Sequence, residues 1–308
     1  MPGAATAPKP TVGASLAAPA AGPASYQVVL ICPNGYAHAG AFAEVMETVV
    51  YGLRELGAEV SYAVNKLVAP GPRAILFGAN LLTPGEADLL PEGTIVYNLE
   101  QIASGSTWCS PAYLSLLRRC TVWDYSRRNI SALVAQGIAA PVHVPIGYMP
   151  QLSRIPDAAL QDIDVLFYGS VNERRARALE ALRAAGLRVH VAYGVYGSER
   201  DALVSRSKVV LNLHYYDTSI FELVRVSYLL ANRKAVVAEL DPRTEIDPDL
   251  AGAVRLAPYE GLVEACRQLV QDEAARRDLQ ETGFARMAAR RTSAYLAEAL
   301  GLPTRPPG

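Results

Sequence analysis

The sequence predicts an α/β protein built from two Rossmann-like, doubly wound domains that face a cleft. Two observations predict this class. Apolar, β-branched runs alternate with helical stretches in two separate series, and a segment punctuated by Pro and Gly lies between the series. The chain has 308 residues, of which 51% are hydrophobic. At roughly 100–200 residues per domain, this length fits two domains with sizeable cores.

The alternating pattern predicts the strands and helices of both series. The first series contains strands at 26–32, 58–64, 73–77, 94–99, 122–126 and 141–144, with helices at 42–53 and 129–136. The second series contains strands at 164–168, 187–193, 208–213 and 235–239, with helices at 172–185, 200–206 and 219–232 and a mostly helical end at 262–300.

Composition sets the domain boundaries. Residues 1–25 are rich in Ala, Pro and Gly, and we expect them to form a disordered tail. Residues 26–150 are expected to form the N-terminal domain and residues 151–300 the C-terminal domain, with a Pro-rich tail at 301–308.

Charge and cysteine content exclude several classes of function. The net charge is -1 with Lys and Arg spread along the chain, so we expect neither a nucleic-acid partner nor an anionic-lipid surface. The four cysteines form no C-x-x-C pair, which argues against a zinc site and against a disulfide framework. No run reaches the roughly 18 apolar residues of a membrane span, and prolines interrupt the N-terminus. We therefore expect a cytoplasmic protein without a transmembrane segment.

The first turn of the second series is a candidate phosphate-binding turn. Gly169 lets the backbone approach a phosphate, Ser170 precedes a helix N-terminus, and Arg174 or Arg175 supplies positive charge for a diphosphate. The alternative is that Ser170-x-x-Glu173 is a capping box and that the arginines form a solvated helix face.

A second candidate turn follows the strand at 208–213. Here Glu222, near a helix N-terminus, would accept hydrogen bonds from sugar or ribose hydroxyls, Arg225 would face a phosphate, and His214 would donate to the diphosphate or sugar. The alternative is a capping box, Ser219-x-x-Glu222, next to an ordinary surface histidine.

The second half resembles the donor domain of the group 1 glycosyltransferases. Residues 221–237 resemble the donor-site helix and the strand after it, and residues 195–212 resemble the helix and strand that lead to it. Residues 164–170 resemble the first strand and phosphate turn, and residues 145–148 resemble the hinge. The resemblance implies the two-domain GT-B fold, with a nucleotide sugar bound by the second domain.

One departure from this family concerns the donor helix. Many retaining members carry two glutamates eight positions apart, and the aligned positions are Ser219 and Ser227. We therefore do not carry over the stereochemistry, and a protein that has lost activity remains an alternative. Ser219 stays a candidate substrate-binding position.

In this arrangement the first domain supplies the acceptor site. Gly35 and His38 lie in the loop after the first strand, and His38 is a candidate general base because its unperturbed pKa is about 6.5. Glu100, at the end of the fourth strand, is a candidate acceptor-binding residue. The alternative is a flexible loop with an incidental histidine. Asp124 and Ser126 are interpreted as cleft-lining or capping residues.

The resemblance implies a metal-independent glycosyltransferase that moves a sugar from a nucleoside-diphosphate sugar to a hydroxyl of a saccharide, peptide or small molecule. His38 and Glu222 are the candidate catalytic residues. No cofactor is expected beyond the nucleotide-sugar co-substrate, because guanidinium groups and helix dipoles neutralise the leaving diphosphate. Two alternatives stay open: a non-catalytic nucleotide-sugar-binding or scaffold protein, and a nucleotide-sugar epimerase. The absence of G-x-G-x-x-G after any strand argues against a dinucleotide oxidoreductase.

Overall fold

A computed structural model describes residues 24–34, 36–102, 108–215 and 220–303. The predicted tail at 1–25 lies outside these ranges except for its last two residues, and of the tail at 301–308 only 301–303 are described. Two of the candidate site residues, Gly35 and Ser219, also lie outside the described residues.

The first half of the chain forms a six-stranded parallel sheet in the order β2-β1-β3-β4-β5-β6. The middle strands are buried on both faces, as their continuous apolar runs require. The strands are β1 (Ser25–Leu30), β2 (Glu59–Val64), β3 (Arg73–Phe77), β4 (Ile95–Asn98), β5 (Thr121–Asp124) and β6 (Val142–His143).

The second half forms a five-stranded parallel sheet in the order β11-β10-β9-β7-β8. Its edge strand β11 was not predicted, since it is three residues long and two of them are exposed. The strands are β7 (Ile163–Tyr168), β8 (Val189–Ala192), β9 (Ser207–Asn212), β10 (Ala235–Glu239) and β11 (Arg255–Ala257).

Both sheets reverse their strand order at the first strand. β1 has β2 on one side and β3 on the other, and β7 has β8 on one side and β9 on the other. In open parallel sheets the connections leave such a point in opposite directions, so a crevice opens beyond the carboxyl ends of the strands. The loops after β1, β7 and β9 are therefore the places where the fold positions a ligand.

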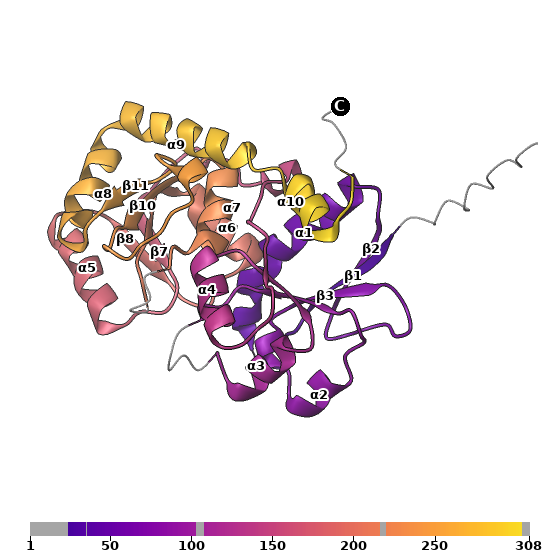
Figure 1. Cartoon of the computed structure of the whole chain (residues 1–308). Coiled ribbons are helices and arrows are strands. Elements are labelled where there is room, and N and C mark those ends of the chain that lie inside the picture. Colours follow the sequence, from indigo (N-terminus) through magenta and orange to yellow (C-terminus); the bar gives the residue numbers. More distant parts are fainter. Residues whose placement is uncertain (1–23, 35, 103–107, 216–219, 304–308) are drawn as a thin grey trace, which may run out of the picture.

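Helices cover the sheets, as Figure 1 shows for the two differently coloured halves. The α-helices are α1 (Ala43–Glu55), α2 (Pro84–Asp88), α3 (Pro111–Leu117), α4 (Arg127–Ala135), α5 (Glu173–Ala184), α6 (Gly197–Ser205), α7 (Leu223–Ala231), α8 (Leu262–Gln271), α9 (Glu273–Ala288) and α10 (Thr292–Leu300). Short 3-10 turns lie at η1 (Ala37–Phe42), η2 (Ala79–Leu81), η3 (Pro150–Leu152), η4 (Pro248–Leu250) and η5 (Tyr259–Gly261).

Two helix starts differ from the capping boxes considered as alternatives. The N-cap of α5 is Asn172, whose Oδ1 accepts a hydrogen bond of 2.9 Å from Arg175 N. Ser170 therefore does not cap α5. Helix α7 begins at Leu223 instead of near residue 219, and its N-cap Glu222 makes no side-chain capping bond. The Glu222 carboxylate points elsewhere because two guanidinium groups hold it, as described below.

The last helix returns to the first half of the molecule. Helix α10 (yellow) packs against α1 (indigo), although the prediction placed residues 151–300 in one domain (Figure 1). Gly52 allows this approach, since a Cβ there would lie 2.7 Å from Thr292 Cγ2 and 2.8 Å from Leu296 Cδ1. Buried Arg290, just before α10, donates from Nε to the Ile146 carbonyl at 3.0 Å and so attaches the returning chain to the linker.

Candidate functional site

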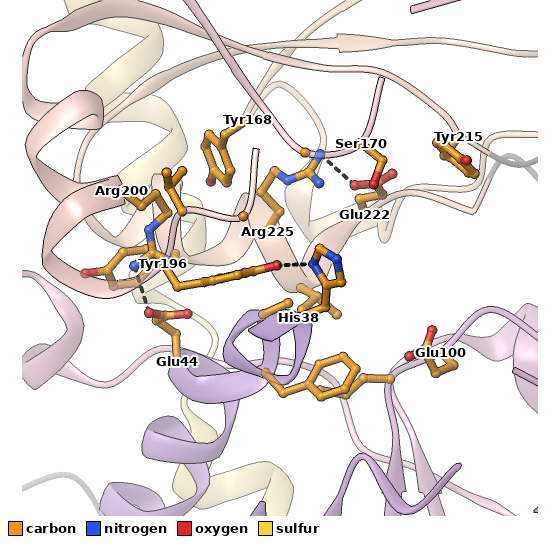
Figure 2. Close-up of a pocket in the computed structure, with 18 of the residues that line it drawn as sticks. His38, Glu44, Glu100, Tyr168, Ser170, Tyr196, Arg200, Tyr215, Glu222 and Arg225 are labelled. Atoms are coloured by element: carbon orange, nitrogen blue, oxygen red, sulfur yellow. Dashed lines mark hydrogen bonds and ion pairs between the residues drawn. The ribbon is translucent and has the colours of Figure 1, made fainter. Parts of the chain in front are cut away.

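A cavity of about 440 Å³ lies between the two halves, at the carboxyl ends of both sheets. The loops after β1, β4 and β5 form one wall, and the loops after β7 and β8 and the start of α7 form the other. Figure 2 shows the two walls facing each other, with His38, Glu44 and Glu100 on the first half and Ser170, Glu222 and Arg225 on the second. The cavity is thus where the two strand-order reversals place a crevice.

The turn after β7 brings a glycine against two arginines. Gly169 has a φ of +137°, a conformation that disfavours any side chain. A Cβ at this position would lie 3.2 Å from Arg225 Nη2 and 3.9 Å from Arg175 Nη1. Gly169, Ser170, Arg175 and Arg225 all line the cavity. The structure therefore places the two predicted turns side by side on one wall.

Glu222 bridges the two arginines of this wall. Its Oε1 lies 3.2 Å from Arg175 Nη2 and its Oε2 lies 2.7 Å from Arg225 Nη1. Burial lowers the pKa of the Arg175 guanidinium, while Glu222 opposes this shift. One carboxylate against two guanidinium groups leaves a net positive charge. We name this set, Gly169, Ser170, Arg175, Glu222 and Arg225, the cationic turn.

Packing fixes the orientation of both arginines. Arg175 is 2% exposed, and it donates from Nη1 to the Ser170 carbonyl at 2.8 Å and from Nη2 to the Leu213 carbonyl. Arg225 donates from Nη1 to Asn212 Oδ1 at 3.0 Å, and its guanidinium carbon lies 5.2 Å from the Tyr168 ring centroid. The side chain of Arg225 remains one-fifth exposed, so it is the arginine of the pair that an anion in the cavity reaches more easily.

Two predicted substrate-binding residues do not line the cavity. Arg174 forms an ion pair with buried Glu239 on β10, with Nη1 2.9 Å from Oε2, and stacks on Tyr259 at 4.0 Å. His214 is buried, its Nε2 lies 2.9 Å from Thr244 Oγ1, and burial lowers its pKa. Both residues organise the second sheet next to the cationic turn instead of facing the cavity.

His38 lies on the opposite wall with both ring nitrogens engaged. Nδ1 lies 2.7 Å from the Tyr196 hydroxyl and Nε2 lies 2.9 Å from the Tyr193 hydroxyl. A neutral imidazole has one N–H donor and one acceptor nitrogen, so one hydroxyl accepts from the ring and the other donates to it. The two tyrosines belong to the second half, and His38 therefore joins the walls across the cavity (Figure 2).

Glu100 also faces the cavity, and its backbone is firmly held. The Glu100 carbonyl accepts hydrogen bonds from Asn98 Nδ2 at 2.9 Å and from Asn129 Nδ2 at 2.8 Å. Burial raises the pKa of the Glu100 carboxyl to about 7. A carboxyl that titrates near neutral pH has the properties of a general base or a hydrogen-bond acceptor for a hydroxyl.

A buried carboxyl, Asp124, supports the loop that carries Glu100. Asp124 accepts from Asn98 Nδ2 at 2.6 Å, from Ser126 N at 2.8 Å and from Asn129 Nδ2 at 3.2 Å. Burial raises the pKa of Asp124 to about 7, although all three donors favour its charged form. Ser126 caps α4 by accepting from Asn129 N at 3.3 Å. Ser126 is thus a capping residue, one of the two interpretations made from the sequence, whereas Asp124 holds the residues around the cap.

Charged residues also connect the halves beside the cavity. Glu44 on α1, 6% exposed, lies 2.7 Å from Arg200 Nη2 on α6. Glu47, one turn further along α1, lies 2.5 Å from Arg154 Nη1. The carboxylates raise the pKa of both arginines although burial acts in the opposite direction. These ion pairs hold α1 against the second half at the base of the cavity.

Solved structures of several glycosyltransferases share the whole architecture of this chain. The Anabaena protein HepE, crystallised with UDP and glucose, superposes with a TM-score of 0.61 over 89% of this chain and 99% of its own, at 10% identity. Sucrose-phosphate synthase from Thermosynechococcus elongatus superposes with a TM-score of 0.54 over 90% of this chain and 97% of its own, at 14% identity. A glycosyltransferase from Rickettsia africae superposes with a TM-score of 0.57 over 91% of this chain and 99% of its own, at 9% identity.

The chain has a GT-B fold. This confirms the prediction of two Rossmann-like domains facing a cleft, and it accounts for the position of the cavity between them. At these identities the likeness concerns the fold alone.

Sequence comparison adds little to the GT-B assignment. No family model matches the chain. An uncharacterized protein of Acanthamoeba polyphaga mimivirus is 24% identical over 189 residues, which cover 58% of this chain and 59% of that protein. A second uncharacterized protein of the same virus is 30% identical over 106 residues, 33% of this chain and 12% of that protein. The chain thus spans less than two thirds of the length of these relatives.

Sequence reasoning did not single out several residues of the GT-B cavity. Tyr193, Tyr196 and Arg200 lie after β8 and on α6. Trp108 lies beyond β4 and was not singled out either. One signal in the sequence does point to them: aromatic residues concentrate in the loops at the carboxyl ends of the strands, where a ligand is expected.

The described part of the chain contains no group of three or more His, Cys, Asp or Glu side chains arranged to hold a metal ion. The two Asp-x-Asp pairs of the sequence are bound to cations outside the cavity. Asp162 pairs with Arg206, and Asp164 pairs with Arg188 and Lys208. Asp247 and Asp249 both pair with Arg290. Within the same residues, every helix is too short or too polar to traverse a bilayer.

Proposed function

We propose that the chain is a metal-independent glycosyltransferase that moves a sugar from a nucleoside-diphosphate sugar to an acceptor hydroxyl. The observation that carries the proposal is the cationic turn, which presents positive charge and a side-chain-free Gly169 to a cavity between two Rossmann-like domains. The complexes of HepE with UDP-glucose support a nucleotide sugar as the donor. We also expect the protein to act in the cytoplasm.

The diphosphate would lie against Gly169 and Ser170, with Arg225 donating to its oxygens. A guanidinium donates bidentate, charge-assisted hydrogen bonds that match phosphate geometry. Positive charge at this point favours the transition state because negative charge develops on the leaving diphosphate. A divalent ion would then not be essential. Glu222 would accept hydrogen bonds from hydroxyls of the ribose or of the transferred sugar.

The acceptor would bind on the wall of the first half. Glu100 and His38 are the two groups there that are able to accept a proton from its hydroxyl. His38 must first leave the hydroxyl of Tyr193 or Tyr196, since both its nitrogens are engaged. The contacts of His38 across the cavity would thus change when the two halves close on the substrates.

A binding protein without turnover is the second candidate. Ser227 is buried on α7, and its hydroxyl donates to the Val224 carbonyl at 3.5 Å. No carboxylate is available at this position, where many retaining members of the group 1 family carry one. Such a protein would bind a nucleotide sugar at the cationic turn but would not release the nucleotide in the presence of an acceptor.

Calorimetric titration with UDP-glucose and with pyrophosphate tests the donor site. Loss of a charge-assisted contact of about 1.5–3 kcal/mol predicts that Arg225→Ala weakens binding of both ligands by about 10- to 100-fold. Arg177→Ala is the matched control, because Arg177 lies on the exposed face of α5 and pairs with Glu173. Glu222→Ala should lower the affinity for UDP-glucose relative to pyrophosphate, since only the former carries hydroxyls.

Unchanged UDP-glucose binding in both Arg225→Ala and Glu222→Ala would show that the donor site lies elsewhere. UDP release from UDP-glucose, measured with and without acceptors, separates a transferase from a binding protein. Transfer that survives EDTA supports metal independence, whereas transfer that stops in EDTA and returns with Mg²⁺ contradicts it.

A further inference from the structure

The two walls of the cavity differ sharply in charge. Every arginine that lines it comes from the second half: Arg175, Arg200 and Arg225. The described lining residues of the first half include two carboxylates, Glu44 and Glu100, and no lysine or arginine. Because Glu44 is neutralised by Arg200, Glu100 is the charge that dominates the wall of the first half.

The sequence extends this observation to the two segments of the wall that follow β1 and β4. Residues 32–53 and 94–117 contain neither lysine nor arginine. A negatively charged group bound here would face Glu100 without a counter-ion from either segment. Two like charges 4 Å apart repel by about 1 kcal/mol in water and about 4 kcal/mol near a protein surface. The wall therefore disfavours phosphate, carboxylate or sulfate groups on a bound molecule.

Aromatic rings form much of the rest of this wall. Tyr36 meets His38 edge-on with ring centroids 5.5 Å apart, and it meets Trp108 in the same manner at 6.0 Å. Tyr36 and Trp108 both line the cavity, so their rings are within reach of a bound molecule. A pyranose ring has the matching shape, since its C–H bonds form an apolar face and its hydroxyls lie around the edge.

The position of Glu100 suits a hydroxyl group at that edge. Its backbone is held by Asn98 and Asn129, which Asp124 orients in turn, so the side chain starts from a fixed point. An ionised carboxylate only accepts hydrogen bonds, and a sugar hydroxyl supplies the donor. Figure 2 shows Glu100 on the opposite side of the cavity from Ser170 and Glu222.

We propose that Tyr36, Trp108 and Glu100 form an acceptor subsite for an uncharged saccharide, whose ring packs on the aromatic side chains and whose hydroxyl donates to the Glu100 carboxylate. This inference rests on the proposed transferase function and adds to it the class of the acceptor. Anionic acceptors such as uronates and phosphorylated sugars are rejected by Glu100.

Saturation-transfer NMR on the full chain with UDP present measures such binding even when it is weak. The probes are maltotriose, cellotriose and, as the anionic counterpart, trigalacturonate, all at pH 8, where Glu100 is ionised since its pKa is about 7. We expect both neutral trisaccharides, or one of them, to bind about tenfold more strongly than trigalacturonate, which corresponds to about 1.4 kcal/mol of repulsion. Trp108→Ala should abolish the signal. Tyr62→Ala, which removes an aromatic ring that is 59% exposed on β2, should leave it unchanged.

A gain of binding provides the sharpest outcome. Glu100→Gln removes the negative charge but keeps the size of the side chain, so trigalacturonate should bind this variant more strongly than it binds the natural chain. Misfolding cannot mimic that result. The inference is overturned if trigalacturonate binds the natural chain as well as the neutral sugars do, if neither neutral trisaccharide responds, or if Trp108→Ala keeps the full signal. A separate UDP titration distinguishes the proposed function from this inference. Absent UDP binding contradicts the proposed function, whereas UDP binding without a preference for neutral sugars contradicts this inference only.

Discussion

Replacing Gly147 by alanine should loosen the attachment of the C-terminal segment to the linker between the halves. A Cβ at Gly147 would lie 2.6 Å from Thr292 Oγ1, 2.7 Å from the Arg290 carbonyl oxygen and 2.8 Å from Thr292 Cα. Ordinary contacts of a Cβ begin near 3.4 Å, and two of these three atoms belong to the backbone. A side-chain rotation therefore cannot relieve the clash, and residues 290–292 must move away from the linker.

The size of the effect follows from what that movement breaks. Overpacking a tight contact costs about 1–3 kcal/mol. The shift also lengthens the hydrogen bond from Tyr148 N to the Arg290 carbonyl, now 2.6 Å, which is worth about 0.5–1.5 kcal/mol. In the opposite direction, alanine restricts the unfolded chain more than glycine does, which stabilises the folded chain by about 0.4–1 kcal/mol. Together these contributions predict that Gly147→Ala lowers the free energy of unfolding by about 2 kcal/mol, within a range of about 0.5–4 kcal/mol.

Urea unfolding followed by circular dichroism measures this change, with a lower midpoint and an unchanged slope as the expected result. Gly85→Ala is the matched control, because no atom lies within 4 Å of a Cβ at Gly85 and its backbone is helical. That variant should be as stable as the natural chain or up to about 1 kcal/mol more stable, because Ala restricts the unfolded chain and favours the helix. A Gly147→Ala midpoint equal to that of Gly85→Ala would show that residues 290–292 adapt freely, and the account of how α10 is attached would be wrong.

Two further predictions concern buried charges. Asp124 has a pKa of about 7 in the folded chain against an ordinary 3.8, so its contribution to stability is complete below pH 3.8 and is lost as the pH rises through 7. Between pH 5 and pH 8 the free energy of unfolding, measured by urea titration, should fall by about 2–3 kcal/mol more in the natural chain than in Asp124→Asn. If it falls by the same amount in both, burial does not raise the pKa of Asp124 as described. Glu44→Gln leaves buried Arg200 with Asp201 alone, so it should lower the free energy of unfolding by about 3 kcal/mol. Glu59→Gln, on the exposed edge strand, is its control, and an equal thermal midpoint for both variants would argue against a stabilising link between the halves.

Local sequence patterns determined most of the sheets. Strand β10 occupies the predicted residues, Ala235–Glu239, because a continuous apolar run has to be buried on both faces wherever it lies. The same patterns placed Gly169 directly after the strand at 164–168 and Arg225 on the helix that follows the strand at 208–213. Because parallel strands end at the same edge of a sheet, the pairing of β7 with β9 brings the two turns together.

Tertiary structure alone decided which side chains face the cavity. Arg174 and Arg175 are neighbours on α5 and look equivalent in the sequence, yet successive residues on a helix point about 100° apart. Arg175 therefore lines the cavity, whereas Arg174 reaches Glu239 on β10. The contacts of His38 with Tyr193 and Tyr196, and the return of α10 to α1, join residues that are far apart in the chain. No local pattern contains such contacts, because they form only when the two halves pack against each other.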